Sequence, residues 1–308
     1  MKQTGLFTHR ACSLHEMGSW HPECPERLAA IQDHLISTGI ASHLLHYDAP
    51  LASTQALQRA HSIDYIECLQ SSVPRDGYRP LDPDTSMNSH TLNAALRAVG
   101  AVVDATERVI GGEIANAFCA VRPPGHHARM SAAMGFCFLN NIAVGVRHAL
   151  DAHGIDRVAI IDFDVHHGNG TEEIFVNDES VLMASFFQHP FYPYSGTGNP
   201  AKNMVNVPLP AGTKGDIARQ VVDEVWLPRL EAFEPQMIFI SAGFDAHRED
   251  DLGQMGLVED DYVYITKRLM DLAQRHAGGR IVSSLEGGYN LSALARSVGA
   301  HVKTLAQL

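Results

Sequence analysis

The chain has 308 residues, enough to bury a large hydrophobic core without disulfide bonds. Its formal net charge of −12 at pH 7, with no run of lysines or arginines, argues against a protein that binds nucleic acid or an anionic membrane surface. Hydrophobic residues make up 45% and charged residues 19% of the chain. This balance is typical of a globular protein and excludes a disordered or collagen-like one.

The cysteines and the apolar segments indicate the cellular compartment of the protein. The five cysteines are an odd number without a CxxC pair, which favours neither a disulfide framework nor a cysteine zinc site. The first residues lack the long apolar segment of a signal peptide, and no uninterrupted apolar stretch approaches the roughly 18 residues of a membrane span. We therefore expect a cytoplasmic protein without a membrane span.

The elements predicted first along the chain are helices. Pro25 suits the first turn of a helix and Gly39 suits a C-terminal cap, so a helix is predicted over residues 26–37. A second helix is predicted over residues 89–110, which are rich in Ala and Val and are followed by two glycines.

Predicted strands then alternate with predicted helices. The strands are apolar, β-rich runs at residues 115–121, 157–163, 181–187, 236–242 and 280–285. Helical patterns occur between most of them, at residues 140–153, 171–176, 216–233, 259–276 and 291–305. This alternation predicts a three-layer αβα fold with a mostly parallel central sheet, and a closed barrel is the alternative. Because no repeat or linker interrupts the chain, we expect one domain over residues 1–308.

Polar segments directly follow four of the predicted strands: RPPGHH (122–127), DFDVHHGNG (162–170), GFD (243–245) and EGGY (286–289). In open parallel sheets, ligands bind outside the carboxyl ends of the strands. Four strands therefore bring histidines, aspartates and a tyrosine to one edge, which core packing does not explain. Isolated histidines are interpreted instead as surface residues or as core residues whose hydrogen bonds are satisfied (His9, His46, His90 and His148).

The segment that starts at Asp162 predicts a metal site. In an extended backbone, Asp162, Asp164 and His166 lie on one face, and a divalent cation offsets the crowding of the two carboxylates. A hydrolytic zinc site has three protein ligands and an open position for water. Asp164 and His166 could supply two ligands and Asp245 the third. A single DxH pattern more often caps a loop, but the added Asp245 and histidine pair reverse that preference.

Three further features fit hydrolysis beside such a metal. His126 and His127 fit a general base and its electrostatic partner, and the preceding prolines favour a fixed loop; two surface histidines are the alternative. Tyr289 could donate a hydrogen bond to an oxyanion, although a ring packed on the sheet is equally compatible. Residues 135–138 could form an aromatic wall. No GxSxG elbow, phosphate-binding loop or HExxH motif is present.

Together these motifs resemble the arginase-type, zinc-dependent histone deacetylase family over nearly the whole length of the chain. The matching segments, in order, are HPECPERL (21–28), LDPDT (81–85), RPPGHH (122–127), GFCFLNN (135–141), DFDVHHGNG (162–170), SAGFD (241–245) and EGGY (286–289). Asn169 after HHG and the sequence SAGFDAHRED (241–250) are more similar to class II and bacterial members, the histone deacetylase-like amidohydrolases, than to class I.

The resemblance implies two metal ions. One zinc ion per chain would be bound by Asp164, His166 and Asp245, although such ligands also accept iron(II) or cobalt(II). A structural potassium ion would lie near the zinc, held by Asp162, Asp164, His166, Ser185 and Phe186.

The resemblance also implies roles in catalysis. His127 would be the general base and acid and would pair with Asn169. His126 would be its electrostatic companion and would donate to Asp162, while Tyr289 would polarise the acetyl carbonyl. The remaining implied residues line or border the substrate channel: Gly135, Phe136, Phe187 or a neighbouring aromatic, Asp82 and Leu252.

The implied activity is removal of acetyl, or another acyl group, from the ε-amine of lysine in proteins or peptides, with release of acetate. Leu252 stands where polyamine-selective relatives have an acidic residue, which favours acyl-lysine. A small acetylated amine such as an acetylpolyamine is the alternative, because residues 249–251 are acidic. A non-catalytic acyl-lysine-binding regulatory protein is disfavoured because the full set of site residues is present. A manganese enzyme of the arginase type is disfavoured because a two-metal site requires additional bridging carboxylates, and this sequence has a histidine pair where they would lie. The sequence leaves a homo-oligomer open.

Overall fold

The computed structural model describes residues 3–198 and 200–308. Eight strands, all paired in parallel, form a central sheet in the order β2-β1-β5-β10-β9-β6-β7-β8. Their bounds are β1 Gly5–Thr8, β2 Leu45–Asp48, β5 Ala117–Cys119, β6 Val158–Asp162, β7 Val181–Gln188, β8 Met204–Leu209, β9 Met237–Ala242 and β10 Ile281–Leu285. Because β2 and β8 are its edges, the sheet is open, and the closed barrel is excluded.

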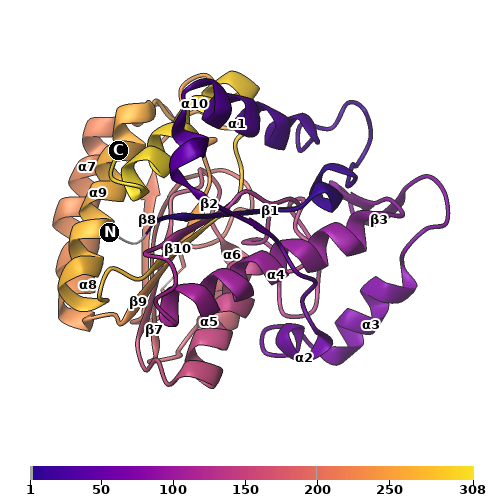
Figure 1. Cartoon of the computed structure of the whole chain (residues 1–308), viewed down its shortest axis with the longest axis horizontal. Helices are drawn as coiled ribbons and strands as arrows, with labels where there is room; N and C mark the ends of the chain where they lie inside the picture. The colour runs from indigo at the N-terminus through magenta and orange to yellow at the C-terminus, as the bar shows by residue number, and fades with distance from the viewer. Residues whose placement is uncertain (1–2, 199) are drawn as a thin grey trace.

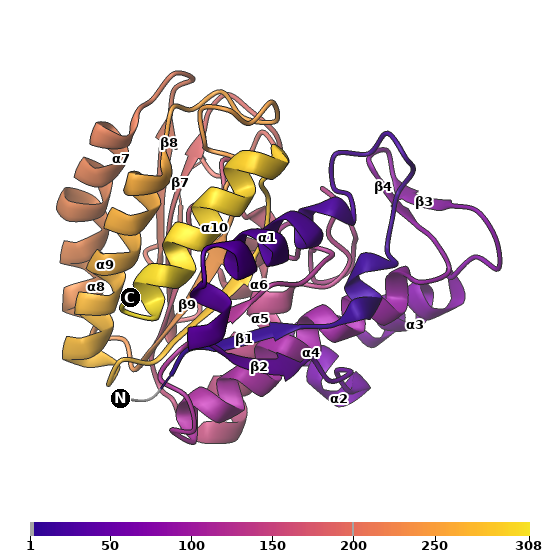
Figure 2. The ribbon, with the colours of Figure 1, turned by 45° about the horizontal axis from the view of Figure 1, so that its top comes forward.

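Helices cover both faces of the sheet, as Figures 1 and 2 show. One layer contains α1 (Glu26–Ser37), α7 (Gly215–Val221), α8 (Leu227–Phe233), α9 (Glu259–His276) and α10 (Leu291–Leu305). The other contains α2 (Thr54–Leu57), α4 (Thr91–Ile110), α5 (Asn141–His153) and α6 (Asn169–Phe175). The predicted three-layer fold with a parallel sheet is therefore confirmed. Within the described residues, no helix combines the length and apolar character that crossing a membrane requires.

Burial on both faces explains why the central strands could be predicted from the sequence. Every residue of β6, β7, β9 and β10 is buried. Strands covered on both faces need unbroken apolar runs, which is the pattern that predicted them. The predicted helix over residues 26–37 begins and ends at the observed residues of α1. The helix predicted over 216–233 is α7 and α8 joined by a π-helical turn, η3 (Val222–Trp226).

Several short elements escaped prediction. The N-terminal region, predicted as helical, also contains β1 and β2, and β2 alternates between half-buried and exposed residues at the edge of the sheet. Four residues with this pattern carry too little apolar signal to stand out. Also missed were β8, the antiparallel hairpin of β3 (Arg79–Asp82) and β4 (Thr85–Met87), α3 (Ile63–Ser71), and the 3₁₀ helices η1 (Arg10–Ser13) and η2 (Ile40–His43).

Acid is expected to destabilise this fold through His61. The imidazole is 3% exposed; its Nδ1–H donates to the Arg129 carbonyl at 3.0 Å and its Nε2 accepts from the Asn140 N–H at 2.9 Å, so it is held neutral. Burial lowers the pKa of His61 from 6.5 to about 4. Because the unfolded chain takes up the proton first, the stabilisation is complete above pH 6.5 and about 3 kcal/mol is lost as the pH falls to 4.

Urea unfolding at pH 7 and pH 4.5 measures this loss. A His61→Gln chain cannot take up the proton, so its free energy of unfolding should fall less across the same interval. Equal losses in both chains would contradict the role of His61.

Candidate active site

Three of the predicted metal ligands meet at the carboxyl edge of the sheet. Asp164 and His166 follow β6, and Asp245 follows the adjacent strand β9. His166 Nδ1 lies 3.0 Å from Asp164 Oδ1 and 3.2 Å from Asp245 Oδ2. One ligand atom of each residue lies within 4.8 Å of the others, so all three can reach one ion.

The hydrogen bonding of Asp245 fits a bound cation. Its Oδ1 accepts from the Val165 N–H at 2.8 Å, whereas its buried Oδ2 has no hydrogen-bond partner among the described residues. Burial raises the pKa of Asp245 to about 7, and the nearby Asp164 carboxylate adds to the rise. A buried carboxylate oxygen without a partner is unfavourable. A divalent cation would satisfy it, and one imidazole with two carboxylates is a ligand set that zinc accepts.

Neighbouring groups hold these ligands in place. The Gly287 N–H donates to Asp164 Oδ2 at 2.9 Å. A Cβ at Gly287 would clash with Asp245 Oδ2, so only glycine allows this approach. Burial lowers the pKa of His166, but the adjacent Asp164 and Asp245 carboxylates outweigh this effect and raise the pKa to about 10. The imidazole and carboxylates therefore hold one another at the point where an ion would bind.

The histidine pair lies directly beside the ligands. The rings of His126 and His127 have centroids 4.0 Å apart. His126 Nδ1–H donates to Asp162 Oδ2 at 2.9 Å, and His127 Nδ1–H donates to Asn169 Oδ1 at 2.8 Å. Each bond fixes a proton on Nδ1, so that in a neutral ring Nε2 is free to accept a proton.

The two histidines have opposite pKa shifts. Burial lowers the pKa of His127 well below its usual value, and the adjacent His126 and His166 rings add to this effect. Burial also acts on His126, but Asp162 and Asp164 outweigh it and raise its pKa well above the usual value. The pair therefore combines a neutral imidazole that can accept a proton with one that carries positive charge.

Tyr289 lies in the loop that follows β10. Its ring lies edge-on to Phe136 at 5.9 Å between centroids, and the Arg27 guanidinium lies 5.0 Å from its centre. Burial raises the pKa of the Tyr289 phenol well above its usual value, and Asp245 adds to the rise. The hydroxyl therefore keeps its proton and can act as a hydrogen-bond donor.

Three buried residues without a predicted role position this loop and the histidine pair. Arg27 donates from Nε to the Gly288 carbonyl at 2.6 Å. Asp250 Oδ2 accepts from the Tyr289 N–H at 2.5 Å. Glu286 Oε2 accepts from the His126 N–H at 3.1 Å. All three lie inside motifs that the sequence analysis quoted, but only contacts between distant segments reveal what they hold.

The loop of Gly135 and Phe136 forms one wall of the site. Both residues have positive φ, 56° and 67°, and a Cβ at Gly135 would clash with the His127 ring. The hairpin of β3 and β4 supports this loop, because the Phe136 N–H donates to Thr85 Oγ1 at 2.9 Å and the Gly135 N–H donates to Asp84 Oδ1 at 3.2 Å. The structure thus brings Gly135 and Phe136 to the site and explains the tolerated strain at Phe136.

Of the two alternatives predicted for the second channel aromatic, Phe187 or a neighbouring ring, the structure favours the neighbouring ring. Strand β7 extends to Gln188, so Phe187 is still inside the sheet, where its buried ring lies 4.5 Å from that of His167. The chain reaches the site only beyond the end of this strand. There Phe191 stacks on His166 at 5.4 Å, and Tyr192 lies edge-on to His127 at 5.3 Å. Neighbouring aromatics therefore form the second wall.

The other predicted residues have no described contact with the ligands or the histidine pair. Asp82 Oδ1 accepts from the Asp84 N–H at 3.3 Å within the β3–β4 hairpin. The Leu252 N–H donates to Asp250 Oδ1 at 3.0 Å, so Leu252 belongs to the turn that positions Asp250. Ser185 and Phe186 are buried in β7, with Ser185 in register beside Asp162.

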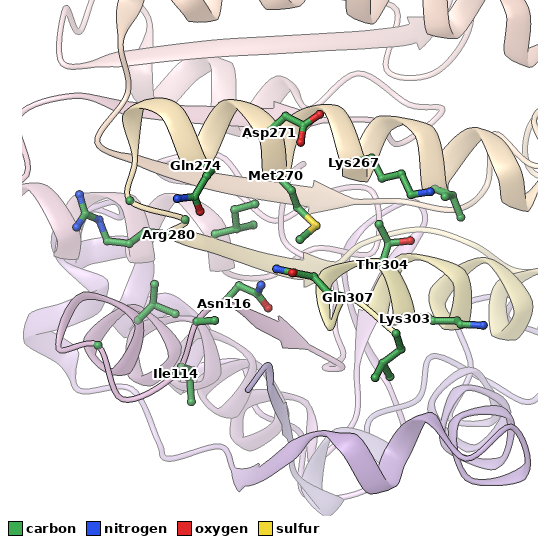
Figure 3. Close-up of a pocket in the computed structure, with 18 of the residues that line it drawn as sticks. Ile114, Asn116, Lys267, Met270, Asp271, Gln274, Arg280, Lys303, Thr304 and Gln307 are labelled. Atoms are coloured by element: carbon green, nitrogen blue, oxygen red, sulfur yellow. The ribbon is translucent and has the colours of Figure 1, made fainter. Parts of the chain in front are cut away.

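A cavity of about 1100 Å³ lies at the opposite, amino edge of the sheet, at the start of β5 and β10 (Figure 3). Its walls come mainly from α4, α9 and α10 and include Lys267, Arg280 and Lys303. None of the predicted site residues lines it. Cavity volume therefore does not mark the edge where the histidines and aspartates gather.

Comparisons with known proteins agree with this geometry. The family model of the histone deacetylase domain matches residues 21–305. A probable deacetylase of Archaeoglobus fulgidus is 38% identical over 296 residues, covering 94% of this chain and 82% of the relative. A histone deacetylase-like amidohydrolase of Pseudomonas aeruginosa is 36% identical over 313 residues, with coverage of 94% and 82%.

Solved structures agree as well. The crystal structure of the HDA15 HD domain aligns with a TM-score of 0.93 at 36% identity, covering 99% of this chain and 89% of that one. A family model that matches most of the chain, relatives of this identity and a matching fold lead to the same conclusion. The chain belongs to the histone deacetylase family and is a hydrolase that acts on amides.

Proposed function

We propose that this hydrolase is a zinc-dependent deacetylase that removes acetyl, or another acyl group, from the ε-amine of lysine in proteins or peptides and releases acetate. One observation carries the proposal: Asp245 Oδ2, which has no hydrogen-bond partner among the described residues, lies 3.2 Å from His166 Nδ1 and beside a histidine pair with opposite pKa shifts. Residues 1–308 would act as a single catalytic domain, and its cytoplasmic location stays a prediction.

Asp164, His166 and Asp245 would hold the zinc ion. When bound, zinc supplies a Lewis acid that polarises the acyl carbonyl and lowers the pKa of water toward about 7. The potassium ion stays a prediction that rests on the resemblance; its proposed residues lie at the adjacent ends of β6 and β7, where Asp162 and Ser185 are register partners.

The residues around the ligands would move the protons. His127 would accept the proton of the attacking water at Nε2, since its Nδ1–H is held by Asn169 at 2.8 Å. It would then return this proton to the departing amine. The Tyr289 hydroxyl would donate to the carbonyl oxygen as negative charge develops there. His126, kept positive by Asp162, would stabilise the same charge.

Three observations support an acyl-lysine over a polyamine. Asp250, one of the acidic residues near the rim, is buried and accepts from the Tyr289 and Asn290 N–H groups, so its carboxylate is not free to attract a cation. Glu249 pairs with Arg296 at 2.9 Å. The aromatic walls formed by Phe136 and Tyr192 suit a slim apolar stem such as that of acyl-lysine.

Metal removal tests the proposal. Purified protein should hydrolyse a fluorogenic acetyl-lysine peptide, lose this activity after chelation, and regain it when zinc is added back; iron(II) and cobalt(II) are added in parallel to identify the preferred metal. Acetylputrescine serves as the competing substrate. Much faster hydrolysis of acetylputrescine would assign the enzyme to small amides. No hydrolysis of either by the metal-loaded chain would instead favour an acyl-lysine-binding protein.

A further inference from the structure

A second cluster of metal-ligating side chains lies between α4 and α5. Glu107 is in the last turn of α4, and His148 and His153 are in the last two turns of α5. These helices end where the chain turns toward the starts of β5 and β6, so the cluster lies at the edge opposite the candidate active site. The deacetylase reaction proposed above does not use these three residues.

The ligand atoms of the cluster converge on one point. Glu107 Oε1 lies 2.6 Å from His148 Nε2 and 3.1 Å from His153 Nε2, and one such atom of each residue lies within 4.8 Å of the others. A tetrahedral zinc ion with bonds of about 2.0–2.1 Å spaces its ligand atoms by about 3.4 Å. Small side-chain rotations would therefore seat an ion among the three atoms.

The hydrogen bonding of the cluster is incomplete without an ion. His148 Nε2 is hydrogen-bonded to Glu107 Oε1, whereas the buried His153 Nε2 has no hydrogen-bond partner among the described residues despite its short distance to the same oxygen. A cation would give the buried His153 nitrogen the partner that it lacks.

The surroundings favour a positive ion at this position. His153 is the last residue of α5, and Glu107 lies three residues before the end of α4. The carbonyl ends of both helices carry partial negative charge, which attracts a cation. The two helices also pack closely, because Gly145 of α5 lies against Val102 of α4 where a Cβ would be too close. The ligands are thus mounted on a rigid pair of helices.

We propose that Glu107, His148 and His153 form a second binding site for a divalent metal ion such as zinc or cobalt(II), with water as the fourth ligand. Two imidazoles and one carboxylate are ligands that such ions accept. The ion would join the C-terminal turns of α4 and α5, a structural role distinct from the reaction at the other edge. The burial of His148 and its hydrogen bond to Glu107 agree with the prediction of a surface or satisfied core histidine, and the proposal adds a ligand role to it.

Arg59 competes with this ion. Its guanidinium contacts His148 Nδ1 and lies 3.7 Å from the Asp151 carboxylate. An ion at His148 Nε2 requires a proton on Nδ1, which would face the guanidinium, so Arg59 would have to turn toward Asp151. Replacing it by methionine removes both this conflict and a like charge. The Arg59→Met chain should therefore bind cobalt(II) roughly tenfold more tightly than the native chain.

Metal counting tests the proposal with cobalt(II) alone. After metal removal, reloading and desalting, the native chain should retain two cobalt ions and the His153→Asn chain one. The His153→Asn chain should also lose the visible absorption bands of cobalt(II) bound at the second site. Asp245→Asn, which removes a ligand of the candidate active site, should retain one ion. The double variant with both His153→Asn and Asp245→Asn should retain none. His43→Asn, at an exposed histidine elsewhere, is the matched control and should retain two.

Three results would overturn the second site: one retained ion in the native chain, unchanged retention in His153→Asn, or weaker binding in Arg59→Met. Circular dichroism shows whether each variant folds. Hydrolysis of the acetyl-lysine peptide should be unchanged in His153→Asn. Failure of the deacetylase proposal would leave the metal count at this site unaffected, so the two proposals fail separately.

Discussion

An Asp245→Asn chain is expected to lose deacetylase activity by roughly 1000-fold or more, together with the active-site metal. The substitution replaces Oδ2, which has no hydrogen-bond partner in the described part of the chain, by an amide nitrogen. It keeps an oxygen in the place of Oδ1, which accepts from the Val165 N–H. One anionic ligand of three disappears, and with it the Lewis acid that contributes several kcal/mol to such reactions.

The same variant separates metal loss from unfolding. Asp245 is a buried carboxylate whose pKa is raised to about 7, so without a metal its charge opposes folding. The metal-free Asn chain should therefore unfold at a urea concentration at least as high as the metal-free native chain. Asp251→Asn, at an exposed aspartate six residues along, is the control and should keep full activity. Native-like activity in Asp245→Asn would refute the role of Asp245 as a ligand.

A Tyr289→Phe chain is expected to keep its metal but lose turnover by roughly 100- to 1000-fold, the effect typical of removing one oxyanion donor. The ring would still pack between Phe136 and Arg27, because neither contact involves the hydroxyl. Asp250 would still hold the loop through the backbone N–H of residue 289. Only the donor at the carbonyl oxygen is removed.

Steady-state kinetics and metal analysis distinguish this donor role from a structural one. Loss of the donor should lower kcat with little change in KM, since the hydroxyl acts mainly in the transition state. The matched control is Tyr194→Phe, at a tyrosine that is 75% exposed, which should behave as the native enzyme does. Turnover within a few-fold of native in Tyr289→Phe would show that the phenol does not stabilise the oxyanion.

The burial of each strand explains whether it could be predicted from the sequence. Strands buried on both faces require apolar runs, so β6, β9 and β10 could be predicted without any knowledge of the fold. The rule that parallel strands present their carboxyl ends at one edge then placed Asp164, His166 and Asp245 together. Edge strand β2, half exposed and four residues long, lacked that signal.

The sequence by itself therefore determined the layered fold and the set of side chains at the carboxyl edge, because both follow from local pattern and strand direction. Only the tertiary structure decided which groups orient them. Arg27 reaches Gly288 across 261 residues, and Asp250 reaches the Tyr289 N–H across 39. The end of β7 decided that Phe191 and Tyr192, not Phe187, flank the site. Such contacts depend on the packing of segments that are distant in the chain, which a local pattern does not encode.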